Sequence, residues 1–122
     1  MSIYQEIIFV HYRNPRNWGR IPGATATTTL NNLLCGDTIT MDLIQKGDKV
    51  KDVKFSGEGC AISKAASSLL TEYIKKNNDT ASLIKLDKKF MIELIGVEIG
   101  VNRLKCLLLP LEALHTLLEV HG

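Results

Sequence analysis

The pattern of apolar and polar residues divides the chain into an initial helix, a small group of strands and a helical second half. Residues 2–13 place Ile3, Ile7 and Val10 on one stripe at helical spacing. Pro15 disfavours helical backbone in the residue before it, so this helix should end there.

Three strand-like segments follow. Residues 24–32 are rich in threonine, which favours β-structure. Residues 38–44 alternate apolar and polar side chains, with Asp42 on the outward-facing set, and residues 50–55 form the returning strand after a turn at 46–48. This pattern predicts a three-stranded antiparallel meander with one face left to be covered.

Helical spacing resumes after Cys60 and continues to about Lys76. Thr80 and Asp87 are suited to cap two shorter helices.

The last helix contains Pro110, whose missing N–H is best tolerated in a first turn. We therefore expect this helix to begin near Leu107. Cys60 and Cys106 would then both lie at helix N-termini, where unpaired N–H groups and the helix dipole favour a thiolate.

Composition indicates one domain, residues 1–122, with 45% hydrophobic and 23% charged residues. The formal charge of +2 is too small to indicate nucleic-acid binding, and no apolar run is long enough to span a membrane. Three cysteines without a visible export signal indicate a reducing cytoplasm, with thiols used for metal or sulfur chemistry rather than disulfides.

Cys35 and Asp37 lie on the connection between the first two strands. Together with Cys60 and Cys106 they could meet at one end of the sheet. Three thiolates and a carboxylate suit zinc, or one side of an iron–sulfur cluster. The spacing includes no C-x-x-C pair, so periodicity alone does not distinguish a shared metal site from three separate cysteines.

Four sequence segments resemble the signatures of the U-type iron–sulfur cluster scaffold family, which includes IscU, SufU and the N-terminal domain of NifU. They occur in the family's order and extend over essentially the whole chain. They are His11-Tyr12-Arg13-Asn14-Pro15-Arg16-Asn17, Cys35-Gly36-Asp37, Gly57-Glu58-Gly59-Cys60-Ala61-Ile62-Ser63 and Arg103-Leu104-Lys105-Cys106.

The resemblance implies an IscU/SufU-like α+β fold and a site built by Cys35, Asp37, Cys60 and Cys106. It implies a non-enzymatic scaffold that accepts sulfur from a cysteine desulfurase, assembles a [2Fe–2S] cluster from iron and sulfide, and passes it to acceptor apo-proteins. Cys106 and Cys35 are the candidate persulfide acceptors. A homodimer of the cluster-loaded form is a further expected assembly.

Two alternatives use the same ligands. One is a zinc-dependent sulfurtransferase that relays persulfide sulfur, and the other is a purely structural zinc protein. Among the ligand positions, the carboxylate of Asp37 is a harder and more exchangeable ligand than a fourth thiolate, which favours release of the cargo. Hydrogen bonding of Asp37 to nearby backbone is the simpler alternative.

The chain departs from the IscU branch in two places. Lys105 stands where IscU has a histidine, and residues 99–103 do not carry the Leu-Pro-Pro-Val-Lys chaperone-recognition segment. These differences argue against a dedicated Hsp70-type partner and favour SufU. The segment between Cys60 and Cys106, however, lacks the insertion usual in SufU. Lys105 is either a solvent-facing cation or a charge that modulates Cys106.

Overall fold

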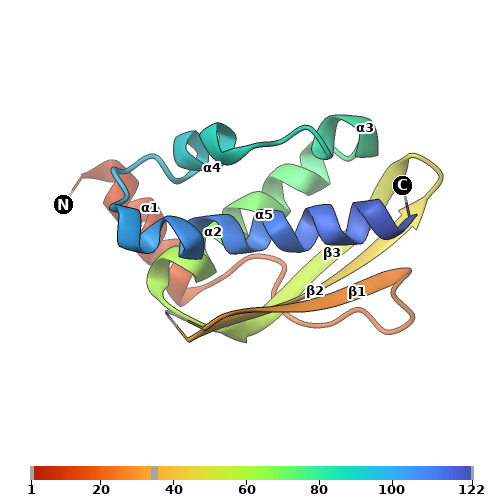
Figure 1. Ribbon diagram of the computed structural model, residues 1–122, viewed down its shortest axis with the longest axis horizontal. Coiled ribbons are helices and arrows are strands. Elements are labelled where there is room, and N and C mark those ends of the chain that lie inside the picture. The colour runs from red at the N-terminus through yellow and green to blue at the C-terminus, as the bar shows by residue number, and fades with distance from the viewer. Residues whose placement is uncertain (1, 34–35, 122) are drawn as a thin grey trace.

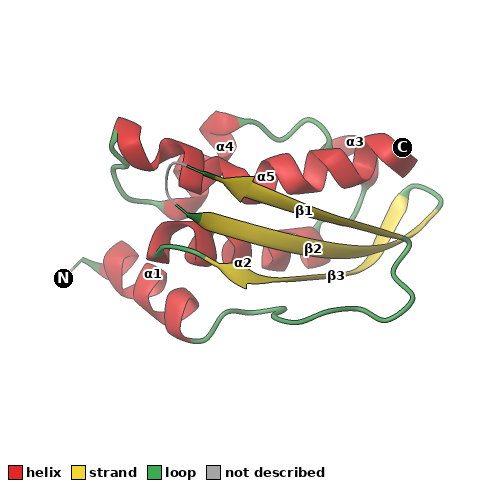
Figure 2. Ribbon diagram, turned by 60° about the horizontal axis from the view of Figure 1, so that its bottom comes forward, coloured by secondary structure: helices red, strands yellow, loops and turns green. Residues whose placement is uncertain are grey.

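The fold is a two-layer α+β arrangement in which helices cover one face of a three-stranded sheet (Figures 1 and 2). The structure, a computed structural model, describes residues 2–33 and 36–121. It confirms the predicted fold class. The strands are β1 (Ala26–Asn32), β2 (Asp37–Lys46) and β3 (Lys49–Glu58), and the helices are α1 (Ile3–Arg13), α2 (Ala61–Lys76), α3 (Thr80–Leu83), α4 (Lys88–Ile95) and α5 (Val101–His121).

The sheet is an antiparallel meander in the order β1-β2-β3. Residue pairing between β1 and β2 runs down to Asn32 opposite Asp37, next to the connection that carries Cys35. Pairing between β2 and β3 ends with Thr38 opposite Glu58. One end of the sheet therefore brings together the start of β2 and the segment that leads into α2.

The hydrophobic core lies between the sheet and the helices. Alternate residues of β2 and β3 face the helices and are almost completely buried, as the alternation predicts. Leucines of α5 and small residues of α2 fill the opposite side. The core members with no exposed surface include Met41, Leu43, Val53, Ala65, Leu70, Ile74, Leu83, Met91, Leu107 and Leu114.

Asp42 corrects one expectation. It belongs to the outward set of β2, yet only 1% of its surface is exposed, because the segment before β1 crosses it. Its carboxylate accepts hydrogen bonds from Arg20, the Ile21 N–H and the Thr27 hydroxyl. Burial by itself raises the pKa of Asp42, but these donors outweigh it and hold the pKa below its usual value.

Helix starts also differ in detail from the sequence pattern. Asp87 caps α4 as predicted, accepting the Phe90 N–H. For α3 the cap is Asp79 rather than Thr80, and its carboxylate accepts the N–H of Ser82. Both caps are aspartates because a short carboxylate reaches the third N–H of the following turn.

The start predicted for the last helix is wrong. Helix α5 begins at Val101, so Pro110 lies in its interior and Cys106 in its second turn. Proline has no N–H to donate to the carbonyl of Cys106, a loss worth roughly 3 kcal/mol in an isolated helix. The helix continues nevertheless because its leucines pack on α2 and the sheet on both sides of Pro110.

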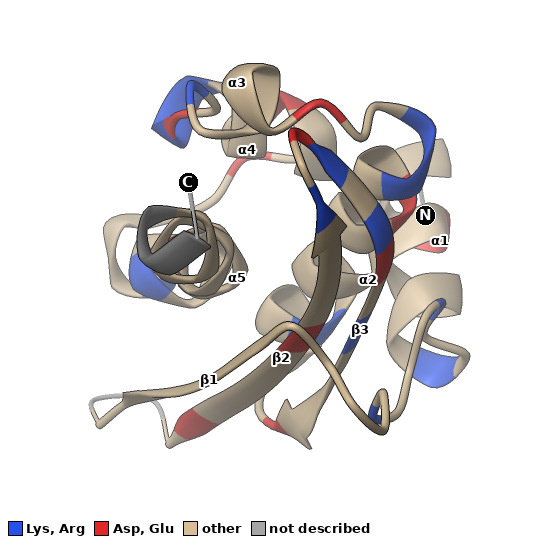
Figure 3. Ribbon diagram, turned by 90° about the vertical axis from the view of Figure 1, so that its right-hand side faces the viewer, with Lys and Arg blue, Asp and Glu red and all other residues tan. Residues whose placement is uncertain are grey.

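Charges are distributed over most elements. Helices α1, α2, α4 and α5 and strands β2 and β3 each carry both basic and acidic residues (Figure 3). The formal charge of +2 is therefore not gathered on a single element. In the described part of the chain, none of the helices has the length and apolarity needed to cross a bilayer.

Candidate metal centre

Three of the four predicted ligands converge at one end of the sheet. The ligand atoms of Asp37, Cys60 and Cys106 all lie within 4.8 Å of one another. Asp37 and Cys106 are buried, with 1% and 0% of their surface exposed, whereas Cys60 is half-buried. Cys35 lies outside the described residues, so its membership of the set stays a prediction.

Asp37 is held in place by the start of α2. Its Oδ1 accepts the backbone N–H of Cys60 at 2.8 Å, and its Oδ2 lies 3.9 Å from the Cys60 sulfur. Cys60 is the N-cap residue of α2 but makes no capping hydrogen bond with its own side chain. Asp37 thus supplies an acceptor and a negative charge at a helix N-terminus, where both are favourable. The Asp37 carboxylate therefore accepts the backbone N–H of Cys60 and also lies beside the Cys60 thiol.

Two glycines shape the loop that carries Cys60. Gly57 adopts a φ of 142°, and a β-carbon there would collide with the backbone carbonyl of Thr38. A β-carbon on Gly59 would lie 2.6 Å from both Asp37 Oδ1 and Ser63 Oγ. The first glycine lets β3 end close to β2, and the second leaves room for the carboxylate.

Cys106 reaches the site from the second turn of α5 rather than from a helix N-terminus. The helix-dipole argument for a thiolate therefore applies to Cys60 and not to Cys106. The sulfur of Cys106 is instead approached by the side-chain amide of Asn32, with 3.9 Å between Nδ2 and Sγ. Sequence reasoning missed Asn32, although asparagine is depleted in strands and its place at the end of one was a usable signal.

Lys105 is exposed and lines an open groove beside the site together with Leu33 and Glu112. Its proposed influence on Cys106 stays a prediction.

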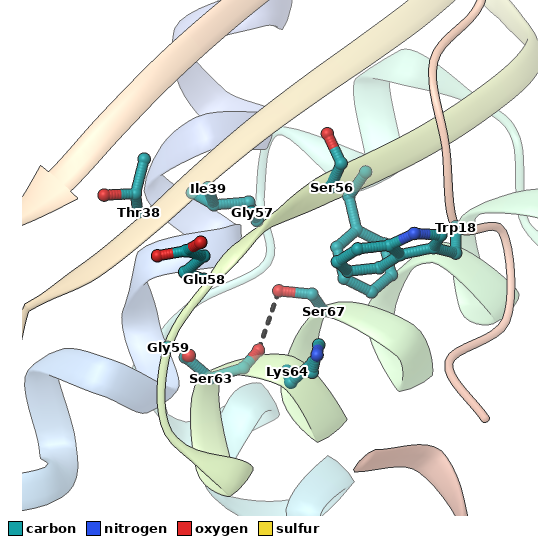
Figure 4. A pocket seen from close by; sticks show the side chains of 11 residues that line it. Trp18, Thr38, Ile39, Ser56, Gly57, Glu58, Gly59, Ser63, Lys64 and Ser67 are labelled. Carbon is teal, nitrogen blue, oxygen red and sulfur yellow. Dashed lines mark hydrogen bonds between the residues drawn. The ribbon is translucent and has the colours of Figure 1, made fainter. Parts of the chain in front are cut away.

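A small pocket lies between Trp18, the end of β3 and the first turns of α2 (Figure 4). The Lys64 ammonium group lies 4.9 Å from the centre of the Trp18 ring and 5.5 Å from that of Tyr12. These cation–π contacts connect α2 to the end of α1, through Tyr12, and to the segment after α1, through Trp18.

His11 has a structural role, in the packing of α1 against α2. Its Nδ1 lies 2.7 Å from the hydroxyl of Ser68, which also accepts the Arg16 N–H. Burial, assisted by the charge of Arg16, lowers the pKa of His11. The hydrogen bond attaches the end of α1 to α2.

The donor set fits a metal ion. Cysteine sulfur and carboxylate oxygen are both ligands that zinc accepts, and thiolates also hold iron in clusters. A metal ion of this kind usually takes four ligands. The three donors described here supply three of them, and the sequence resemblance assigns the fourth to Cys35. Half-buried Cys60 gives the site a side open to exchange.

Comparison with known proteins agrees with this geometry. Residues 3–119 match the NifU-like N terminal domain family. The chain is 38% identical over 97 residues to the zinc-dependent sulfurtransferase SufU of Bacillus subtilis, covering 80% of this chain and 65% of that protein. It is 34% identical over 94 residues to an iron–sulfur cluster assembly scaffold protein IscU of Archaeoglobus fulgidus, covering 77% of this chain and 61% of that protein.

A solved structure supports the same assignment. The crystal structure of a candidate iron–sulfur cluster assembly scaffold protein for the SUF system, from Fervidobacterium islandicum, superposes with a TM-score of 0.74 at 31% identity and covers 93% of this chain and 94% of its own. The chain thus spans somewhat less than two thirds of the Bacillus and Archaeoglobus relatives but nearly all of this one. The motifs, the fold and the match over residues 3–119 together establish that the chain belongs to the NifU-like N-terminal domain family.

Proposed function

We propose that this protein is an iron–sulfur cluster assembly scaffold. It receives sulfur from a cysteine desulfurase, assembles a [2Fe–2S] cluster as its cargo and passes the cluster to acceptor apo-proteins. The observation that carries the proposal is the convergence of the Asp37, Cys60 and Cys106 ligand atoms within 4.8 Å, in a chain of this family. Cys35 completes the proposed ligand set.

The sulfur step is an exchange between thiols. A thiolate of this chain attacks the outer sulfur of a persulfide on the desulfurase, and the desulfurase cysteine leaves as a thiolate. One S–S bond breaks and one forms, so no net electrons are exchanged. An external electron donor then reduces the transferred sulfur to sulfide for cluster assembly. Cys106 and Cys35 are the proposed acceptors, and since Cys106 has no exposed surface, its use requires the site to open locally.

Zinc-dependent sulfur transfer is the second candidate, and the 38% identity to the Bacillus subtilis SufU favours it. In this function a resident zinc ion would be held by Cys35, Asp37, Cys60 and Cys106 and would keep the thiols deprotonated. The persulfide would pass to a cysteine of this chain and then to an acceptor. A purely structural zinc site would bind the same ion without carrying sulfur.

Metal and sulfide analysis of the protein purified without oxygen distinguishes these functions. A scaffold is expected to hold iron with acid-labile sulfide, or to assemble both when iron, cysteine and a desulfurase are supplied. Tightly held zinc that iron and sulfide do not replace would instead favour sulfur transfer or a structural site. Mass spectrometry after incubation with desulfurase and cysteine then separates those two, because only a sulfur carrier gains persulfide. If no persulfide forms and the desulfurase is not stimulated, a structural zinc site is the interpretation that remains.

Asp37 is proposed as the exchangeable ligand, and two substitutions separate this role from its backbone contact. Asp37→Asn keeps an oxygen that can accept the Cys60 N–H but removes the negative charge. Asp37→Ala removes both and should also cost about 1 kcal/mol of stability through the lost cap. We expect both variants to assemble a cluster and to transfer it about tenfold more slowly.

The measurement is transfer to an apo-ferredoxin, followed by visible absorbance from equally loaded proteins. If Asp37→Asn transfers its cluster at the wild-type rate, the labile-ligand role is wrong and the scaffold proposal is unaffected.

A further inference from the structure

The side chain of Asn32 points into the candidate metal centre although it is not one of the predicted ligands. Its Nδ2 lies 3.9 Å from the Cys106 sulfur, a long contact suited to sulfur as a weak acceptor. Both residues are buried, with 8% of Asn32 and none of Cys106 exposed. An amide in this position is a hydrogen-bond donor to whatever form the sulfur takes.

Backbone pairing fixes the place of this amide. Asn32 is the last residue of β1 and pairs directly with Asp37, the first residue of β2. The carbonyl of Asn32 also accepts the N–H of Gly36 at 2.9 Å, which closes the chain between the strands. Two directly paired positions of the hairpin thus reach the site, Asp37 with a carboxylate and Asn32 with an amide.

A buried thiolate needs such a donor. Cys106 carries negative charge when it binds metal, and its burial removes the water that would otherwise stabilise that charge. Helix α5 offers no compensation, because Cys106 lies in its second turn and not at its N-terminus. A donated N–H stabilises the thiolate and fixes the direction in which the sulfur points.

We propose that Asn32 is a positioning residue of the metal centre, whose side-chain amide donates a hydrogen bond to the Cys106 thiolate and orients it toward the metal. The inference rests on the proposed metal-binding function. Asn32 itself does not contact the metal ion, and it acts through Cys106.

Asn31 provides a matched control. It is the same residue type one position earlier in β1, so its side chain points to the other face of the strand. It is exposed and accepts a hydrogen bond from the Thr38 hydroxyl at 2.9 Å. Asn31→Leu therefore makes the same chemical change in the same strand without touching the Cys106 sulfur.

The test compares wild type, Asn32→Leu, Asn32→Ala and Asn31→Leu loaded with zinc and with cobalt(II). Zinc affinity is measured by competition with a chromophoric chelator. Asn32→Leu is expected to bind zinc about 10- to 100-fold more weakly than wild type. Asn31→Leu is expected to bind zinc with the wild-type affinity. The sulfur-to-cobalt charge-transfer band of the Asn32 variants should move to lower energy, since a thiolate that has lost one hydrogen-bond donor is more electron-rich. The d–d bands report the coordination geometry and should keep their tetrahedral pattern.

A measurement on the wild-type protein keeps the proposal testable even if the Asn32 variants do not fold. With ¹¹³Cd in the site, the Asn32 side-chain amide proton that bonds to the Cys106 sulfur should show a scalar coupling to the metal. Its NMR chemical shift should also change on metal binding. The side-chain amide of Asn31 should show neither effect. If the wild-type protein shows no sulfur-to-cobalt charge-transfer band after cobalt is added, the proposed metal site itself is wrong. Normal cobalt binding with no coupling to Asn32 and no difference between Asn32→Leu and Asn31→Leu would overturn the role of Asn32 alone.

Discussion

Replacement of any one of the predicted cysteine ligands by serine is expected to lower zinc affinity by about 100-fold or more. Four ligands together bind a structural zinc ion with roughly 10–16 kcal/mol, so one ligand accounts for about 3 kcal/mol, or about two factors of ten. The test applies to Cys60→Ser, Cys106→Ser and Cys35→Ser, read by chelator competition and by metal content after purification.

Asp52→Ala is a suitable control for these variants. Asp52 lies in β3 opposite Ile44, toward the other end of the hairpin from Asp37, and forms an ion pair with Lys75. It should change neither affinity nor metal content. A cysteine variant that keeps its full complement of zinc would exclude that residue from the site, which matters most for Cys35.

Gly57→Ala is expected to destabilise the fold by about 3 kcal/mol or more. The new β-carbon would collide with the carbonyl of Thr38, and the φ of 142° is one that side-chain-bearing residues rarely adopt. Relief of this strain requires β3 to move away from β2 at the end of the sheet that carries Asp37. Chemical denaturation measures the loss of stability, and zinc affinity should fall with it.

Gly47→Ala separates the two causes. Gly47 also has a positive φ, 62°, but a β-carbon there would meet nothing within 4 Å. It should cost only about 1 kcal/mol, the usual penalty of a left-handed conformation. If the two alanine variants are equally stable, close approach to Thr38 is not what requires glycine at 57.

The sheet and most helices could be predicted because local patterns and tertiary structure agree. The alternation in 38–44 and the helical spacing after Cys60 are also the faces that the core buries. The same agreement holds for the cap at Asp87, where a short aspartate side chain satisfies the first turn. In these segments the information is local.

The errors arose where distant packing overrides a local rule. Pro110 argued for a late start of the last helix, but leucines on both sides of it are anchored in the core. Asp42 fitted an outward position, and only the crossing of a distant segment buries it. Neither effect can be read from a window of sequence, because each depends on which surfaces meet in three dimensions.

The candidate site was predictable mainly from its motifs. Periodicity suggested that the cysteines occupy similar ends of elements, but it gave the wrong local environment for Cys106. The resemblance named Asp37, Cys60 and Cys106 together, and the structure brings their ligand atoms close to one another. The position of Asn32 beside the Cys106 sulfur depends on strand register, which motif comparison does not supply.

The composition of the core has a consequence for how this protein can be used repeatedly. The buried apolar cluster between sheet and helices includes neither Asp37 nor Cys60. Small zinc domains that depend on their ion for a core unfold when the ion leaves. Here the apolar cluster already joins the sheet to the helices, so we expect a molecule without its proposed cargo to keep its shape. If the proposed scaffold function is correct, such a molecule is expected to be filled again without refolding, so that each delivery would need only iron, sulfur and reducing equivalents.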